Sequence, residues 1–278
     1  MDKKVIMQYT NLNQFFMENI MTKKGERHRL SLIIATLGPS TDNEKELITM
    51  ITAGIARQWT DGVDIARVLY SDGESVAKNR IEIFRDQSNK RNLSTQVYLD
   101  SDEDNIDLDK YIAFANAINP DIISFPKSIG LELFSSLKES LNKNIKISLR
   151  LRSSDTFADL GDYYDHCNYV MVESTSQDIV DNKLVENAKL KNVEPIYLAK
   201  MPTLMKGQVQ SREENFEIGH TLEEGFDIVA LYEETAQGPY PARSVKCIDE
   251  IAVESEKLRV NPFADLLEKV MSIFKRTT

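Results

Sequence analysis

The sequence contains little cysteine and no long apolar run. Only Cys167 and Cys247 occur among the 278 residues, far apart and without the spacing of metal ligands. A disulfide is the alternative, but we expect two buried free thiols in a reducing cytoplasm. No run of about 18 apolar residues occurs, so the sequence predicts no transmembrane helix. The polar, partly basic N-terminus lacks the apolar core of a signal peptide.

Basic residues and the common nucleotide or metal motifs are also scarce. The chain has 34 Lys and Arg against 44 Asp and Glu, a formal net charge of −10. This balance argues against a nonspecific nucleic-acid-binding protein, which carries a basic stripe. GxGxxG, Walker A, HExxH and CxxC motifs are all missing. His28, His166 and His220 lack metal-ligand spacing, and we expect them to be structural or solvated.

Short apolar runs alternate with amphipathic stretches eight times along the chain. The runs are rich in Ile, Val and Leu, as in parallel strands that are covered on both faces. This alternation without a linker predicts an α/β fold: a single (β/α)8 barrel over residues 31–278 after an N-terminal extension, 1–30. A doubly wound open sheet is the alternative. The expected strands are Ser31–Thr36, Val63–Val68, Thr95–Asp100, Asp121–Phe125, Ile145–Leu151, Tyr169–Glu173, Pro195–Lys200 and Asp227–Tyr232. The expected helices are Asn43–Ala53, Glu74–Asp86, Leu108–Ile118, Leu131–Leu141, Asp178–Leu190, Glu214–Glu224 and Phe263–Phe274, and Tyr9–Met21 is an amphipathic stretch that could cover the barrel or a neighbour.

The first strand–helix unit has clear boundary signals. Thr41-Asp42-Asn43-Glu44 predicts a capping box that opens the helix, and Gly54 suits the position just after it. Ile55–Gly62 then reads as an inserted loop. The loop holds the single tryptophan, Trp59, which we expect to fold against the barrel, with a partner contact as the alternative.

Two segments resemble pyruvate kinase. The first reads IIATLGPSTDNEKELITMITAG and, after the insertion, VDIARVLYSDG; the second reads SREENFEIGHTLEEGFDIVALYEETAQGPYPARSV. The core of the second, Glu234-Thr235-Ala236-Gln237-Gly238 followed by Tyr240-Pro241, is the more specific. The resemblance covers roughly Ser31–Glu256 and implies the catalytic barrel alone. The segment SDEDNIDLD after Asp100 leaves no room for the family's lid domain, and the chain has no counterpart of its C-terminal domain.

The resemblance implies that the family's magnesium ligands are replaced here. Arg150 falls at the family's lysine and Arg152 at its metal-binding glutamate, and alternation along the strand puts both on one face. Ser176 falls at the second metal-binding aspartate, although a shifted register would place Asp178 there. Lys200 replaces a substrate-contacting threonine. Because arginine cannot ligate Mg²⁺, we expect no ordinary magnesium-dependent phosphoryl transfer.

Other positions match the family. Arg67 matches the arginine near the phosphate, and Ser71 and Asp100 match two ligands of its monovalent cation. Leu69 stands at a third such ligand, which argues against potassium binding. Glu234 is also present, and we expect it to hold the loop after the eighth strand. We therefore predict no cofactor.

Four cationic side chains are expected to gather at the barrel mouth. Clustered arginines suit metal-free binding of phosphate or carboxylate, so we predict a small anionic metabolite as ligand. The alternative is a structural ion network with nearby carboxylates. The cationic residues are Arg67, Arg150, Arg152 and Lys200, and the carboxylates of the alternative are Glu173, Asp100 and Glu234.

Three functions remain open on this basis. The first is a repurposed, metal-independent enzyme in which Lys200 and Arg150 are catalytic; here Lys200 could be a desolvated amine that forms a Schiff base. The second is a non-catalytic, ligand-sensing barrel. The third is weak pyruvate kinase activity through a metal site relocated to Glu173 or Asp178. We expect a cytoplasmic protein with no membrane or nucleic-acid partner, and a homodimer through barrel helices is one open arrangement.

Overall fold

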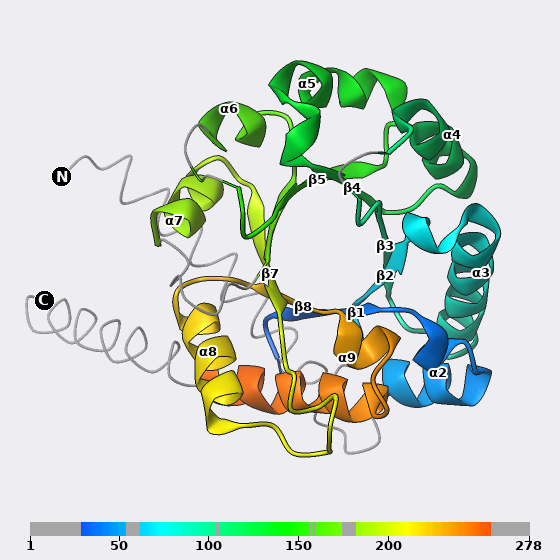
Figure 1. The fold of residues 1–278 in the computed structure, drawn as a ribbon, viewed down its shortest axis with the longest axis vertical. Coiled ribbons are helices and arrows are strands. Elements are labelled where there is room, and N and C mark those ends of the chain that lie inside the picture. The colour runs from blue at the N-terminus through cyan, green and yellow to red at the C-terminus, as the bar shows by residue number, and fades with distance from the viewer. Residues whose placement is uncertain are drawn as a thin grey trace, which may run out of the picture.

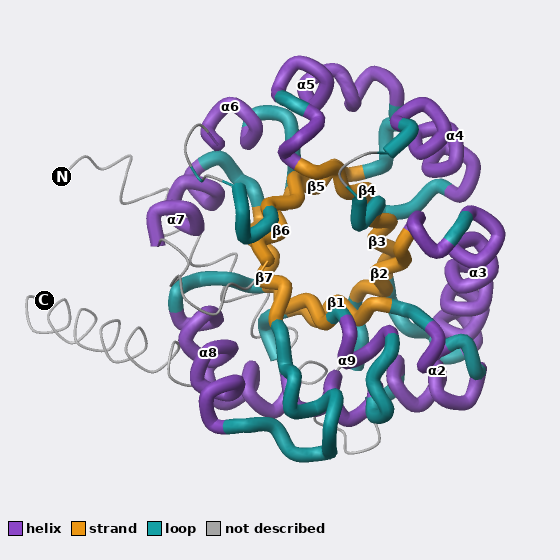
Figure 2. Tube along the Cα trace, in the orientation of Figure 1, coloured by secondary structure: helices purple, strands orange, loops and turns teal. Residues whose placement is uncertain are grey.

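The computed structural model describes residues 29–53, 62–103, 106–155, 157, 160–173 and 182–256. Eight parallel strands form a closed barrel in chain order, and the last strand pairs with the first. Helices surround the strands, as Figures 1 and 2 show. The predicted (β/α)8 barrel is confirmed, and the open sheet is excluded because the edges pair. The strands are β1 Leu32–Thr36, β2 Ile65–Leu69, β3 Gln96–Asp100, β4 Ile122–Pro126, β5 Lys146–Leu151, β6 Tyr169–Glu173, β7 Glu194–Ala199 and β8 Ile228–Leu231.

Most helices lie close to the ranges predicted from the sequence. The range predicted for α4 agrees with the structure, whereas α3 runs four residues beyond its predicted end at Asp86 because Gln87 and Ser88 are buried against the barrel. Most of the insertion at Ile55–Gly62, with Trp59, and the predicted stretches Tyr9–Met21 and Phe263–Phe274 lie outside the described residues. The helices are α2 Glu44–Ile51, α3 Glu74–Lys90, α4 Leu108–Ile118, α5 Leu131–Ser140, α6 Leu160–Tyr164, α7 Asn182–Leu190, α8 Arg212–Glu223 and α9 Glu233–Ala236, with 3-10 turns η1 Pro39–Thr41, η3 Tyr70–Asp72 and η4 Lys127–Ile129, and residues 241–256 are helical.

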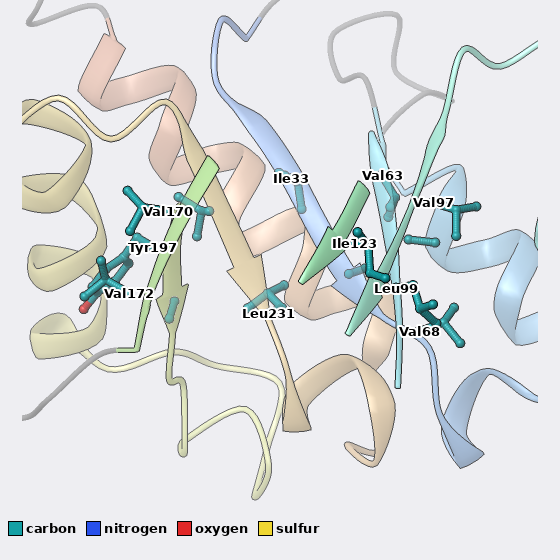
Figure 3. Packing of buried hydrophobic residues seen from close by; sticks show 14 of the residues in the cluster. Ile33, Val63, Val68, Val97, Leu99, Ile123, Val170, Val172, Tyr197 and Leu231 are labelled. Atoms are coloured by element: carbon teal, nitrogen blue, oxygen red, sulfur yellow. The ribbon is translucent and has the colours of Figure 1, made fainter. Parts of the chain in front are cut away.

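Alternate strand residues fill two separate apolar clusters. Ile33 (Figure 3) belongs to the outer cluster, which also contains helix residues such as Phe84. Ile34, the next residue, belongs to the inner cluster that fills the barrel. This period of two is the reason why the strands read as continuous apolar runs in the sequence. On β5 the inward positions are polar instead, Ser148 and Arg150, and both are buried.

The predicted capping box at the start of α2 is wrong. Asn43 caps the helix, because its side chain accepts a hydrogen bond from the Lys45 amide at 2.9 Å. Thr41 ends the preceding turn η1, where its hydroxyl bonds to both the amide and the carbonyl of Gly38 at 3.0 Å. Glu44 accepts a hydrogen bond from Gln87 instead of capping the helix. The intervening turn therefore moves the cap two residues along the chain.

Arg29 lies fully buried at the amino-terminal end of the barrel. Its guanidinium donates to Asp249 at 3.0 Å, to Asp64 at 2.9 Å and to the carbonyl oxygen of Gly62 at 2.9 Å. It also donates to the carbonyl oxygen of Ser31. These bonds connect the segment before β1 to the β2 side of the barrel and to the helix over residues 241–256. Arg29 lies within the predicted N-terminal extension, but its side chain is buried against the barrel.

A second contact at this end joins the same two segments. The Glu256 carboxylate accepts hydrogen bonds from the Leu30 amide at 2.6 Å and from the Ser31 amide and hydroxyl at 2.7 and 2.6 Å. Residues 225 positions apart therefore bind one another directly. The helix over residues 241–256 is held against the start of β1 by charge-assisted hydrogen bonds as well as by apolar packing.

Both cysteines are free thiols, as predicted. Cys247 is buried, but Cys167 is only partly buried, so the expectation of two buried thiols holds for one of them. Burial raises the pKa of Cys167 to about 12 and that of Cys247 to about 11. Neither thiol is therefore a ready nucleophile at neutral pH. Within the described residues, no helix is both long and apolar enough to cross a bilayer.

Gly38 follows β1 and lies against Ala236, the last residue of α9; Figure 1 shows α9 next to β1. A Cβ atom on Gly38 would stand 2.5 Å from the carbonyl oxygen of Ala236 and 2.7 Å from its Cβ. Because the contact is with backbone, we expect Gly38→Ala to lower the free energy of unfolding by about 1–3 kcal/mol. Urea denaturation measures this change. Gly161→Ala, in α6, is the control: a Cβ there meets no described atom within 4 Å, so the change should be neutral or slightly stabilising. Equal effects of the two variants would contradict the close contact.

Candidate functional site

A cavity of about 230 Å³ lies at the carboxyl ends of the strands. Larger grooves of about 710 and 500 Å³ run between α3 and α4 and between α6 and α7, on the outside of the barrel. We consider the smaller cavity the candidate site, because (β/α)8 enzymes carry their active sites at the strand ends and because charged groups converge there. The cavity is lined by Arg67, Asp102, Arg150, Leu151, Arg152, Met171, Glu173, Leu198 and Tyr232.

Arg67 and Asp100 form a tight, fully buried ion pair at the base of the site. Nε and Nη2 of Arg67 lie 2.8 and 2.7 Å from Asp100 Oδ2, and both side chains are 0% exposed. Nη1 donates to the Thr36 hydroxyl at 3.2 Å. Burial alone would raise the pKa of Asp100, but the charges of Arg67 and Arg150 outweigh it and hold that pKa below its ordinary value. Asp100 is therefore an ionised counter-ion of the arginines.

Arg150 is buried as well but is held much more loosely. Its Nη1 lies 3.3 Å from both Asp100 Oδ1 and Asp102 Oδ1, and its Nη2 lies 3.2 Å from the carbonyl oxygen of Glu103. Charge-assisted bonds are usually about 2.7–2.9 Å long. Its Nε is buried and has no hydrogen-bond partner in the described structure. Arg150, a lining residue of the cavity, thus has unused hydrogen-bonding capacity.

Asp102, which the sequence analysis did not single out, links most of the site. Its backbone is in the left-handed region, with φ 55°. Its Oδ1 lies 3.3 Å from both Arg67 and Arg150, and its Oδ2 accepts a 2.7 Å hydrogen bond from the Tyr232 hydroxyl. The Tyr232 ring lies under the Arg67 guanidinium at 4.7 Å. Burial, followed by the bond to Asp102, raises the pKa of Tyr232 and keeps the phenol a donor.

Lys200 lies at the rim of the site, and its exposure argues against the alternative in which it is a desolvated amine. The side chain is 56% exposed and its Nζ lies 3.0 Å from Glu173 Oε1. Strand β7 ends at Ala199, so Lys200 has already left the barrel wall. Glu173, the last residue of β6, is 31% exposed and lines the cavity. The structure therefore brings Lys200 next to the site through Glu173 and does not place it among the lining residues.

The other proposed site residues are distributed unevenly. Arg152 lines the cavity, and its Nη2 donates to the backbone oxygen of Asp102 at 3.0 Å. Ser71 is exposed on η3 and is not among the lining residues. Glu234 is buried, and it accepts hydrogen bonds from the backbone amides of Met201 and of Tyr232, the latter at 3.3 Å. This agrees with its expected role in holding the loop after β8. Burial raises the pKa of Glu234 despite those bonds.

The charges that line the cavity leave a small positive excess. Three arginines face the two carboxylates of Asp102 and Glu173, which gives 3 − 2 = +1. Asp100 behind the wall and Lys200 at the rim cancel each other, so the excess is the same when they are included. Ser176 and Asp178, the positions considered for metal binding, lie outside the described residues. Among the residues that are described, no group of three His, Cys, Asp or Glu could hold a metal ion.

The two alternatives from the sequence, a cluster of cationic side chains and a structural ion network, both describe part of this site. Arg67, Arg150 and Arg152 do converge on one cavity, and an ion network with Asp100 and Asp102 is present at the same place. A scan against known protein families finds no match for the chain, and no curated protein matches it in sequence either.

Proposed function

We propose that this barrel binds a small organic anion at Arg150, without a divalent metal. The observation that carries the proposal is the unpartnered, buried Nε of Arg150 beside an accessible cavity. A buried donor without a partner costs about 1–3 kcal/mol, more when it is charged. An anion that binds the Arg150 guanidinium supplies the negative charge that this incompletely bonded group lacks, so the free site favours an anion at this position.

The contrast with Arg67 supports the assignment of Arg150. Arg67 makes two short contacts with Asp100, whereas each of the three bonds that Arg150 makes is 3.2 Å or longer. A carboxylate or phosphate can therefore improve the geometry around Arg150 without breaking a strong bond. We assign Arg67 a structural role and Arg150 a role in binding the ligand. Arg152 is a second cation that lines the same cavity.

The rest of the cavity supports a compact ligand with an apolar part. The lining residues Met171 and Leu198 belong to the inner apolar cluster and give the cavity an apolar part. A volume of about 230 Å³ is the share of about eight water molecules, below the roughly 300–1,000 Å³ of pockets that hold drug-sized ligands. A short carboxylic acid, or a phosphorylated acid of similar size, fits these dimensions.

We further propose that the chain is a divergent relative of the pyruvate kinase barrel that has lost ordinary magnesium-dependent turnover. The replacements at Arg150 and Arg152 support this view, because guanidinium groups repel Mg²⁺ where carboxylates would bind it. The exposure and pairing of Lys200 do not favour Schiff-base catalysis, so binding is the better-supported role. The two free thiols are compatible with the proposed cytoplasmic location.

Ligand titration of two matched variants tests this proposal. Thermal-shift and calorimetric titrations with pyruvate, phosphoenolpyruvate and inorganic phosphate are run in EDTA and again with Mg²⁺. We expect at least one probe to bind in EDTA, and Arg150→Met to weaken its affinity by about tenfold or more, the effect of one or two charge-assisted bonds. Arg212→Gln removes one positive charge from an exposed position on α8 and should leave the affinity unchanged.

Two outcomes would count against the proposal. Binding that strictly requires Mg²⁺ would point to a metal site. Equal loss of affinity in both variants would mean that net charge, and not the cavity, attracts the anion. Circular dichroism of Arg150→Met establishes that the variant is folded, and Arg150→Lys, which keeps the charge but loses the planar fork, provides a milder second variant.

A further inference from the structure

The cavity also contains a carboxylate that is only weakly engaged. Glu173 lines the wall, and its one ion pair in the described structure is with Lys200 at 3.0 Å. That pair is largely solvated, since Lys200 is 56% and Glu173 31% exposed. Exposed ion pairs of this kind contribute about 0–1 kcal/mol. A cation that enters the cavity can therefore replace Lys200 at Glu173 at little cost.

The second lining carboxylate does not offer the same opportunity. Asp102 already accepts from Tyr232 at 2.7 Å and lies 3.3 Å from both Arg67 and Arg150. An incoming cation at Asp102 would meet those two guanidinium groups directly. Glu173 is on β6, the strand that pairs with Arg150's strand β5, and its partner on β7 is the lining residue Leu198. The cavity thus has loosely held positive charge at Arg150 and loosely held negative charge at Glu173 on neighbouring strands.

The strand register fixes how these two groups are arranged. Arg150 on β5 is the Cα partner of Met171 on β6, and Glu173 stands two residues further along β6, about 7 Å at the usual rise. Glu173 is in turn the partner of Leu198 on β7. Met171 and Leu198 therefore form an apolar surface directly beside the two charged groups. A ligand that joins a positive and a negative charge to a short hydrocarbon body matches this order.

From this arrangement we infer that the ligand is a zwitterionic amino acid. Its carboxylate binds Arg150, its ammonium group replaces Lys200 at Glu173, and its side chain packs on Met171 and Leu198. The inference rests on the proposed function, because it uses the same cavity and the same arginine, and it adds the requirement for an ammonium group.

Matched probes separate the inference from the proposed function. Valine, 3-methylbutanoate and 2-methylpropylamine share the same 2-methylpropyl unit and differ in the charged groups that it carries. Alanine and propionate form a second pair. Dissociation constants are measured by calorimetry for the wild-type protein and the variants Glu173→Gln and Lys200→Gln. We expect an amino acid to bind the wild-type protein about tenfold more tightly than its des-amino acid, as one charge-assisted hydrogen bond predicts. The amine alone should bind poorly, because the arginines repel it.

The variants identify the group that recognises the ammonium. Glu173→Gln should remove the preference for the amino acid, while the des-amino acid binds more tightly than to the wild-type protein, because a negative charge is lost and Lys200 then adds to the positive field. Lys200→Gln should strengthen amino-acid binding, since the competing cation is gone. Des-amino acids that bind the wild-type protein as tightly as their amino acids would overturn the inference and leave anion binding intact. If no probe binds, phosphate and phosphoenolpyruvate included, the inference and the proposed function both fail.

Discussion

Replacement of Arg29 by methionine is expected to lower the free energy of unfolding by about 3–5 kcal/mol, the usual cost of removing one partner from a buried ion pair. Arg29 is 0% exposed and bonds to two carboxylates and two carbonyl oxygens. Its loss leaves Asp249, which is 1% exposed, without its cation. Urea denaturation monitored by circular dichroism measures the change.

A surface pair provides the comparison for Arg29. Lys78 and Glu82 lie 3.9 Å apart on α3 and are 61% and 64% exposed. Lys78→Met should change the free energy of unfolding by less than about 1 kcal/mol, because water screens the pair. An Arg29→Met variant as stable as Lys78→Met would show that the contacts at the amino-terminal end of the barrel contribute little to the fold.

Asp100→Asn is expected to destabilise the protein by a similar amount, about 3–5 kcal/mol at pH 7. Asp100 is fully buried and faces Arg67 at 2.7 Å and Arg150 at 3.3 Å. The neutral amide keeps the size of the side chain but leaves two buried guanidinium groups with less negative charge nearby. Asp102, which is 26% exposed, can offset only part of this loss. Thermal and urea denaturation of the variant measure the effect.

The contribution of ionised Asp100 to the free energy of unfolding should also decrease as the pH falls. Its folded pKa is lowered, so the unfolded state takes up the proton first as the pH falls. The contribution is therefore complete above the unfolded pKa of about 3.9 and is lost as the pH falls from there through the folded pKa. We expect the stability difference between the wild-type protein and Asp100→Asn to be constant from pH 7 to about pH 5 and to shrink below about pH 4. A difference that grew on acidification would contradict an ionised Asp100.

The barrel could be predicted from the sequence because its strands are buried on both faces. Each predicted strand is present, and β6 has the predicted bounds Tyr169–Glu173. The ends of β1, β3 and β5 at Thr36, Asp100 and Leu151 also agree. The remaining ends differ by one or two residues, as at β2, where the strand pairs from Ile65 and not from Val63. Apolar patterning marks where a segment is buried, whereas hydrogen bonds to neighbouring strands decide where the ladder starts. The short helix α6 and the helix over residues 241–256 were not anticipated, because neither forms a long amphipathic stretch that is separate from the segments around it.

The sequence predicted the cations of the site and two of its carboxylates, Asp100 and Glu173, but not how they are connected. Arg67, Arg150 and Arg152 stand at strand ends, and strand ends meet at one mouth in any parallel barrel. Asp102 was missed because its role depends on a left-handed backbone and on a tyrosine 130 positions away. An aspartate two residues beyond a buried strand was the one signal available. Whether the Lys200 amine is desolvated depends on its exposure and on its ion pair with Glu173, and both are set only in the folded chain.

The bond network around Arg29 and Glu256 has a consequence for how the protein matures. The start of β1 is held by residues about 225 positions downstream, and β1 cannot close the ring until β8 exists. A ribosome adds about 5–20 residues per second. The strand β1 therefore remains for tens of seconds without β8 and the helix over residues 241–256. During that interval the edges of β1 and of the latest strand are exposed to other chains. We therefore expect the nascent chain to depend on chaperones that shield strand edges until Glu256 has been synthesised.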